Sequence, residues 1–362
     1  MISRLRPYAV KLLLALSSIV LTVGLLEGGT RLVGISPQPE RFQLTPLLGW
    51  QWTPGYDQSE AYKGTQFRMT VNQQGLRAPA TDHNYAIPKP PGTLRVLALG
   101  DSVVASPGVP WDETFVAQLE AELQRDFSAR TVEVINAGTD DYSTEQERIW
   151  LQEKGLAFAP DLVILHVYLN DSRSFGAPTP RVAQITNFLA QHSAVYALVR
   201  QVQIANQVAQ EDFRFRYMPA LEAGEWRTDT AVLTELIQTA DRDWGLAWYD
   251  QAQRTVEENV LQIQQLTAAQ GIPLLMVLFP VNVQLYAEVD TPLGLTTPQQ
   301  EFALFAGQHD LPVLDLLPVL EAVPDDDLFF DQVHIKPVGH APIARAIAHA
   351  LRENQLLPGD ER

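Results

Sequence analysis

The sequence contains no cysteine, and its basic residues are outnumbered, with 26 Lys and Arg against 43 Asp and Glu. The lack of cysteine excludes disulfide frameworks, thiolate zinc sites, iron–sulfur clusters and cysteine nucleophiles. The net charge of −17 argues against nucleic acid as a partner, because affinity for a polyanion depends on Lys and Arg. Motifs for metalloproteases, phosphate-binding loops and dinucleotide sites are also missing, so we expect no metal and no cofactor.

One long apolar run, Leu12 to Leu26, lies near the N-terminus behind a basic flank. As a helix this run covers about 22 Å, but a span that begins near Pro7, with Lys11 snorkelling, reaches the roughly 30 Å of a bilayer core. No clear cleavage site follows the run, which favours an anchor over a signal peptide. We therefore expect residues 1–35 to anchor the chain in a membrane, with the remainder periplasmic or extracellular. Cleavage of the segment would instead give a secreted protein.

Residues 36–92 have a different composition, rich in proline and containing Trp50 and Trp52. The alternation of Phe67, Met69 and Val71 with polar residues predicts one short, half-buried strand that ends in a turn. This composition indicates strands and turns rather than helix. We expect this accessory segment to form a small cap packed on the main domain.

From residue 93 to about 358, apolar runs alternate regularly with helical patterns. This order predicts an α/β fold, a three-layer sandwich with a five-stranded, mostly parallel sheet and helices on both faces. The interval 172–255 exceeds what a crossover needs, so we expect a helical insertion there. An apolar stripe from Ile185 to Val202 predicts one amphipathic helix in it, packed on the core. The expected strands are 94–99, 132–135, 162–169, 272–279 and 311–317, and the expected helices 112–126, 143–156, 256–270, 298–308 and 338–353.

Polar residues follow these strands where they meet at the carboxyl edge of the predicted sheet, the edge at which such folds bind ligands. A serine hydrolase needs a nucleophile, a base, a carboxylate that holds the base, and donors to the oxyanion. Ser102 after the first strand suits the nucleophile, and Asp331-x-x-His334 suits the carboxylate and base. The N–H groups of Ser102 and Gly138 and the side-chain amide of Asn170 suit the oxyanion hole. Each piece alone is more often a helix cap or a turn, but the joint order favours a site.

Four blocks carrying these residues, LALGDSVVAS, INAGTDDYST, VYLND and FDQVHIKPVGH, resemble the SGNH, or GDSL-type, hydrolase superfamily in the family's order. The segment VNQQGLR, together with the anchor, is similar to a bacterial membrane-anchored subgroup. The resemblance implies a flavodoxin-like sheet and a carboxylic ester hydrolase with an acyl-serine intermediate. Tyr168 stands where the family often has glycine, which implies a small acyl group such as acetyl if the side chain points into the site.

The resulting expectation is an extracytoplasmic serine esterase that removes O-acyl groups from cell-envelope or exported carbohydrate. Its expected partners are an acylated carbohydrate or other small ester, and the membrane through the N-terminal helix. Two alternatives use the same fold. The first alternative is an O-acyltransferase that modifies an exported polysaccharide with the same residues. The second is a non-catalytic carbohydrate-binding domain.

Overall fold

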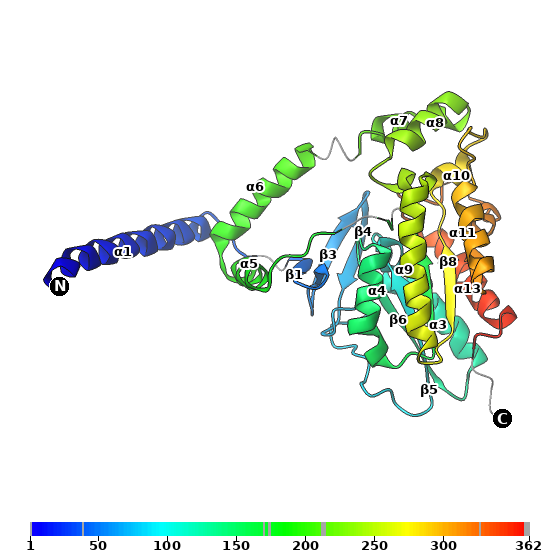
Figure 1. Ribbon diagram of the computed structural model, residues 1–362, viewed down its shortest axis with the longest axis horizontal. Helices are drawn as coiled ribbons and strands as arrows, with labels where there is room; N and C mark the ends of the chain where they lie inside the picture. The colour runs from blue at the N-terminus through cyan, green and yellow to red at the C-terminus, as the bar shows by residue number, and fades with distance from the viewer. Residues whose placement is uncertain are drawn as a thin grey trace.

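The computed structural model describes residues 2–37, 40–168, 171–172, 175–210, 215–325 and 327–357, with the backbone alone for 2–9 and 204–210. A long helix, α1 (Ile2–Leu32), projects from a body built around one five-stranded sheet (Figure 1). The strand order is β6-β5-β7-β8-β9 and every pairing is parallel. This is the flavodoxin-like order, so the predicted fold class is confirmed. The strands are β5 (Thr93–Gly100), β6 (Thr131–Gly138), β7 (Leu162–Val167), β8 (Leu274–Leu278) and β9 (Val313–Asp315).

Helices cover both faces of the sheet, so β5, β7 and β8 are buried along their whole lengths. On one face α3 (Phe115–Asp126) packs against α13 (Pro337–Glu353). On the other face α4 (Thr144–Glu153) packs against α9 (Asp250–Ala268), as Figure 1 shows. The last of the long crossover helices, α11 (Thr297–Gln308), contacts both α9 and β9.

The accessory segment contains four strands, of which the alternation of Phe67, Met69 and Val71 located one. The strand β1 (Phe42–Thr45) pairs with β2 (Gly49–Trp52), and β3 (Asp57–Tyr62) pairs with β4 (Thr65–Thr70), both antiparallel. The two-residue turn of the β3–β4 hairpin, Lys63-Gly64, has φ values of 45° and 85°, as a tight hairpin of this kind requires. No apolar pattern predicted β3, because its residues are mostly polar.

The apolar stripe from Ile185 to Val202 lies on two helices rather than on the single helix that we predicted. The helix is interrupted at Ser193, so α5 (Pro180–His192) ends there and α6 (Ala194–Gln210) begins. The Ser193 hydroxyl accepts from the N–H of Tyr196 at 3.1 Å. The apolar stripe also does not pack on the core, since Phe188 is 60% exposed. The shorter helices are α2 (Ser102–Ala105), α7 (Met218–Ala223), α8 (Thr230–Thr239), α10 (Asn282–Tyr286) and α12 (Leu317–Glu321).

A buried arginine ties the accessory segment to the body. The Arg77 guanidinium donates to the carbonyl oxygens of Ala105, Ser106 and Val109, with Ser106 at 2.6 Å and Val109 at 2.5 Å. Burial lowers the pKa of Arg77 to about 9, which still leaves it charged at neutral pH. The three carbonyls belong to α2 and the loop that follows it, so Arg77 fixes the chain directly after Ser102.

We expect Arg77→Met to lower the free energy of unfolding by about 3 to 5 kcal/mol, because three buried carbonyl oxygens lose a charged donor. Urea unfolding of the full chain measures the change. Arg68→Met is the matched control, because Arg68 lies on the same accessory segment with its side chain 69% exposed. The two variants should unfold at clearly different urea concentrations, and equal midpoints would contradict the role assigned to Arg77.

Candidate active site

A cleft of about 520 Å³ opens at the carboxyl edge of the sheet, between the body and the tip of the β3–β4 hairpin. Three of the predicted site residues line it together with two hairpin residues that the sequence did not single out. The lining residues are Tyr62, Lys63, Ser102, Pro107, Asp140, Asp141, Phe215, Met218, Asp243, Asp331, Gln332, Val333 and His334.

Ser102 is placed by the turn from β5 into α2. The Asp101 carboxylate accepts from the N–H of Val103 at 2.8 Å and so caps the short helix that Ser102 begins. Glycine is needed just before this turn, because a Cβ on Gly100 would lie 2.5 Å from a methyl carbon of Val104. The hydroxyl of Ser102 therefore sits at the edge of the sheet, at the start of the first helical turn.

The structure brings Ser102, His334 and Asp331 into one hydrogen-bonded chain. The Ser102 Oγ lies 2.9 Å from His334 Nε2, and His334 Nδ1 lies 3.0 Å from Asp331 Oδ2. A carboxylate only accepts, so the ring proton is on Nδ1 and the bare Nε2 accepts from the serine hydroxyl. This is the tautomer in which an imidazole can take the proton of the serine.

Tyr62, at the end of β3, adds a fourth member that the sequence analysis missed. Its hydroxyl donates to Asp331 Oδ2 at 2.5 Å, and its oxygen lies 2.7 Å from His334 Nδ1. The Tyr62 oxygen can accept from the Nδ1–H, because its own proton is given to the carboxylate. The ring also packs edge-on against His334, with the centroids 5.3 Å apart. No motif marks Tyr62, and the only sequence signal was the Lys63-Gly64 turn beside it.

The charges of Asp331 and His334 shift each other's pKa toward the charged form. Burial raises the pKa of the Asp331 carboxyl, but the charge of His334 and hydrogen bonds from His334 and Tyr62 outweigh it and hold that pKa well below its usual range. Burial lowers the pKa of His334, and the Asp331 carboxylate outweighs this and raises the pKa above its ordinary value. Burial and the Asp331 charge raise the pKa of Tyr62, so its hydroxyl stays protonated.

The structure corrects the oxyanion role predicted for Gly138. The Gly138 N–H donates to the side-chain oxygen of Asn136 at 3.0 Å, and a Cβ on Gly138 would lie 2.4 Å from the nitrogen of Ala105. Gly138 therefore allows β6 to pack closely behind α2 instead of facing the cleft. Two residues of this loop, Asp140 and Asp141, line the cleft, and Asp141 has a left-handed φ of 63°. Asn170 lies outside the described residues, so its predicted role stays a prediction.

Two tryptophans of the accessory segment hold the loop after β6. Trp52 Nε1 donates to the carbonyl of Gly138 at 2.8 Å, and Trp50 Nε1 donates to the carbonyl of Asp140 at 2.9 Å. The Arg41 guanidinium pairs with the Asp140 carboxylate at 2.9 Å. The wall of the cleft that carries Asp140 and Asp141 is thus positioned by residues of the accessory segment.

Tyr168 lies beneath the cleft rather than in it. Its side chain is 1% exposed and its N–H donates to the Asp171 carboxylate at 2.7 Å. The possibility that Tyr168 narrows an acyl pocket is therefore not supported. The neighbouring His166 is also fully buried, and burial lowers its pKa to about 4, so it is a neutral core side chain.

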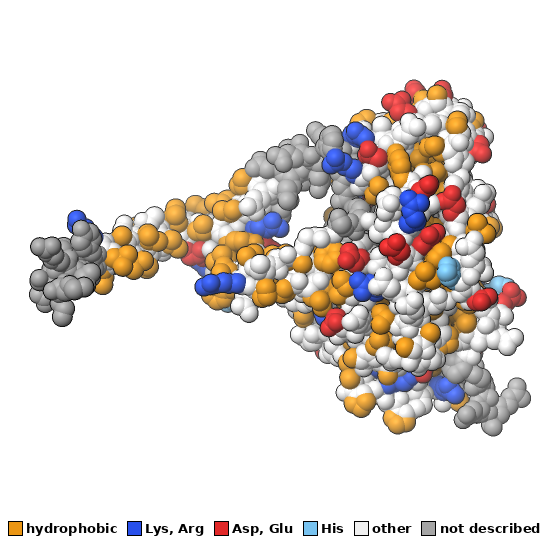
Figure 2. Space-filling view, in the orientation of Figure 1, with side chains coloured by type: hydrophobic (Ala, Val, Ile, Leu, Met, Phe, Trp, Pro, Cys, Tyr) orange, Lys and Arg blue, Asp and Glu red, His pale blue; other side chains and the backbone are white. Residues whose placement is uncertain are grey.

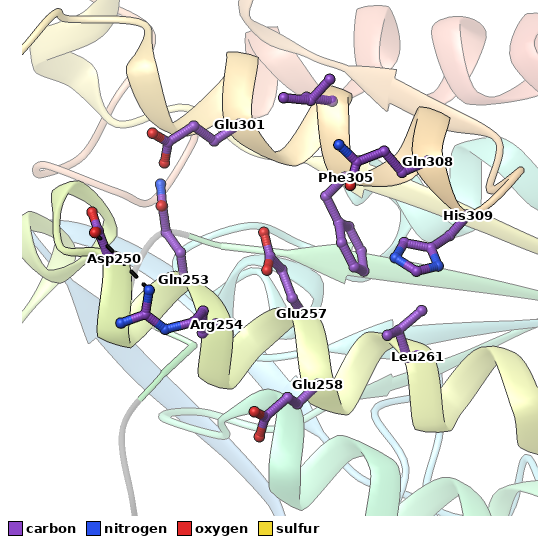
Figure 3. Close-up of a pocket in the computed structure, with 11 residues that line it drawn as sticks. Asp250, Gln253, Arg254, Glu257, Glu258, Leu261, Glu301, Phe305, Gln308 and His309 are labelled. Atoms are coloured by element: carbon purple, nitrogen blue, oxygen red, sulfur yellow. Dashed lines mark ion pairs between the residues drawn. The ribbon is translucent and has the colours of Figure 1, made fainter.

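A second groove, of about 540 Å³, lies between α9 and α11 on the surface (Figure 3). It is lined by acidic side chains including Glu257 and Glu301, and none of the predicted site residues contributes to it. Burial raises the pKa of Glu257, and the negative charge of Glu301 adds to this effect. The groove contains no nucleophile paired with a base, so the chemistry lies in the cleft around Ser102.

No protein-family model and no curated protein matches this chain. Among solved structures, it is similar to TesA, at 13% identity over 72% of this chain and 98% of that one, with a TM-score of 0.42. It is also similar to a catalytic mutant of Axe2, an acetylxylan esterase from Geobacillus stearothermophilus, at 14% identity over 71% and 94%, with a TM-score of 0.43. A GDSL-like lipase from Bacteroides thetaiotaomicron is similar at 11% identity over 72% and 88%, with a TM-score of 0.37. The roles of the residues in this chain therefore rest on its own geometry.

We expect Tyr62→Phe to lower kcat about 10- to 100-fold with little change in KM, because a buried carboxylate loses one donor and Nδ1–H loses its nearest acceptor. Hydrolysis of a chromogenic ester measures the rate, and the NMR resonance of the ring N–H should move with it. Tyr56→Phe is the matched control. It removes another tyrosine hydroxyl from the same hairpin, one that donates to Glu60 at 2.8 Å outside the cleft. Equal rates in the two variants would show that the Tyr62 hydroxyl does not position the triad.

The raised pKa of His334 predicts the pH dependence of the reaction. Protonated His334 cannot accept from Ser102, so kcat/KM should fall as the pH drops through the pKa of His334, above the ordinary value of about 6.5. In Asp331→Asn the carboxylate is lost and burial remains, so the fall should move to lower pH while the maximal rate decreases. A pH profile of kcat/KM for both proteins tests this, and an acid limb that stays in place would contradict it.

Proposed function

We propose that the protein is a serine esterase that cleaves carboxylic esters through an acyl-serine intermediate. The observation that carries the proposal is the hydrogen-bonded chain from Ser102 through His334 to Asp331 at the carboxyl edge of the sheet. His334 Nε2 takes the proton of Ser102 as its oxygen attacks the ester carbonyl, and returns the proton to the leaving alcohol. Water, activated by the same imidazole, then releases the acyl group.

Asp331 and Tyr62 support the charge that develops on His334. When His334 accepts the serine proton it becomes an imidazolium, and the adjacent carboxylate stabilises it in a buried site. Tyr62 keeps that carboxylate ionised by donating to Oδ2 and fills the space beside Nδ1 that water would otherwise enter. The hairpin hydroxyl therefore fixes the orientation of the imidazole before substrate binds.

The tetrahedral intermediate needs donors aimed at its oxyanion. We assign this role to the N–H of Ser102 and to the side-chain amide of Asn170, as the motif order indicates. Because Gly138 donates to Asn136, we replace it in this role by the N–H of Asp141, one of the two residues of the same loop that line the cleft.

The lining of the cleft favours a neutral polyol as the alcohol part of the substrate. Carboxylates of Asp140, Asp141 and Asp243 line the cleft and can accept from hydroxyl groups, while Phe215 and Met218 offer apolar surface. Asp140 also pairs with Arg41, and Asp243 also accepts from Tyr217. The excess of acidic groups over the single Lys63 disfavours anionic substrates. We propose an O-acyl ester of a cell-envelope or exported carbohydrate as the substrate.

The location proposed for this activity is outside the cytoplasm, on a membrane anchor. The helical segment Val10–Leu32 has a mean hydropathy of 2.0 and none of its most apolar stretch is buried against the protein. That segment is long and apolar enough to cross a bilayer. The basic residues that precede it favour a cytoplasmic N-terminus, which would put the cleft on the other side.

The test is hydrolysis of p-nitrophenyl acetate by the full chain in detergent, with Ser102→Ala beside it. We expect the variant to lose about four orders of magnitude in kcat/KM while its unfolding midpoint stays unchanged. Ser59→Ala, an exposed serine on β3, is the control that should keep full activity. Equal rates in Ser102→Ala and the unmodified chain would overturn the proposal. p-Nitrophenyl esters of longer acyl chains in the same assay show which acyl length is preferred, and added sugar acceptors test for acyl transfer.

A further inference from the structure

The outward face of α5 and α6 is apolar and exposed. On α5, Val182, Ile185 and Phe188 follow one another at intervals of three and are 51%, 54% and 60% exposed. On α6, Val199 and Val202 are 46% and 53% exposed. A monomeric soluble protein seldom leaves a continuous helical face of this kind in water. We name residues 180–202 the α5–α6 corner.

The corner is held firmly on its inner side, so the apolar face is fixed outward. Ala183 and Ala190 are buried. Between them, Asn187 donates to and accepts from the backbone of Leu44 in β1, with both distances 2.9 Å. The helix α5 therefore docks on the accessory segment with its small and polar side and cannot turn its large apolar side chains inward.

The corner is joined to the membrane helix through Glu27. The Glu27 carboxylate accepts from the N–H of Ala194 at 2.8 Å, from the N–H of Val195 at 3.2 Å and from the Ser193 hydroxyl at 2.9 Å. It thus caps the first turn of α6 from outside that helix. Arg31, one turn further along α1, pairs with Glu27 and donates to the carbonyl of His192 at 2.8 Å.

This junction fixes the height of the corner relative to a bilayer. The uncharged run of α1 ends at Leu26, and Glu27 is the next residue. A carboxylate and the hydrogen-bonded groups around it belong at the interface rather than in hydrocarbon. The corner contacts α1 at Glu27 and Arg31, so if α1 spans a bilayer, residues 180–202 lie next to the lipid surface. Figure 2 shows hydrophobic side chains along α1 that continue onto this corner.

The charge of the corner differs from that of the rest of the chain. Residues 172–210 contain no Asp or Glu, although the chain has 43 of them. The corner carries Arg181 and Arg200, of which Arg200 lies 3.6 Å from Glu40. Two arginines beside the apolar side chains, on a segment with no acidic residue of its own, match an anionic lipid surface.

We propose that the α5–α6 corner lies on the surface of an anionic lipid bilayer, with Val182, Ile185, Phe188, Val199 and Val202 in contact with lipid. The proposal rests on the proposed membrane anchor and does not depend on the esterase reaction. The corner then acts as a second membrane contact beside α1. Two contacts prevent the body from swinging about a single helix and hold the cleft at one orientation to the membrane.

The chain has no cysteine, so a single introduced cysteine can be spin-labelled without background. We would label Ile185→Cys and Phe188→Cys in the full chain, reconstituted in vesicles of phosphatidylcholine and phosphatidylglycerol. The measured quantity is the ratio of the collision rate of each label with oxygen, which concentrates in lipid, to its collision rate with a water-soluble nickel chelate. This ratio should be several times higher for both labels than for a control label. The control is Leu304→Cys, an apolar residue of α11 that is 64% exposed on the body. Val20→Cys in α1 reports whether the anchor itself is inserted.

Lipid contact at positions 185 and 188, with water contact at 304, supports the proposal. Labels at 185 and 188 that behave like 304 would overturn it, as would labels shielded from both reagents, which indicates a protein partner on this face. A label at position 20 that reports water would mean that the anchor has failed rather than the corner alone. In vesicles of phosphatidylcholine only, the lipid contact should weaken, and an unchanged signal would overturn the preference for anionic lipid.

Discussion

The buried carboxylate of Asp331 is the group on which the rest of the active-site arrangement depends. A negative charge removed from water is stable only if donors surround it. Asp331 finds four, the N–H groups of Val333 and His334 at 2.9 Å each, the ring Nδ1–H of His334, and the hydroxyl of Tyr62. Three of these come from the same turn of the chain. The fourth comes from the accessory hairpin, so the catalytic cluster is complete only when that hairpin is docked.

Other loops around the cleft also depend on donors from the accessory segment. Loops at the carboxyl edge of a parallel sheet expose backbone carbonyls that no neighbouring strand can satisfy. In this protein the accessory segment supplies the missing donors. Arg77 donates to carbonyls of the loop after α2, and Trp50 and Trp52 donate to carbonyls at the end of β6 and in the loop that follows it. Each donor is a side chain with a fixed shape and a buried or half-buried position. The same hydrogen bonds therefore fix the loops and attach the accessory segment to the body. Removing one of these donors would affect both the position of the loop and the docking of the segment.

The sequence was sufficient for the sheet and for three of the site residues because both depend on local patterns. Apolar runs such as Leu94–Leu99 mark strands that are buried on both faces, and Asp331-x-x-His334 lies within one turn. Tyr62 could not be predicted, because it meets Asp331 across 269 positions of sequence through the docking of two chain segments. The role of Gly138 was wrong because the direction of its N–H is set by the side chain of Asn136, which no spacing rule describes. The stripe on α5 and α6 had the right period, but periodicity does not say which surface covers an apolar face.

A continuous series of contacts runs from the membrane helix to the cleft. Glu27 caps α6, Asn187 of α5 pairs with Leu44 in β1, β1 pairs with β2, and Trp50 of β2 donates to the carbonyl of Asp140 in the cleft wall. Every step is a hydrogen bond to backbone or a strand pairing, and these interactions tolerate little change in geometry. An ester held in the cleft is thus held at a defined position relative to α1. If α1 spans a bilayer, an acylated chain must reach the cleft at a fixed distance from that membrane, and substrates that diffuse freely gain nothing from this arrangement. The geometry therefore favours an acylated polymer that lies at or near the membrane over a small dissolved ester.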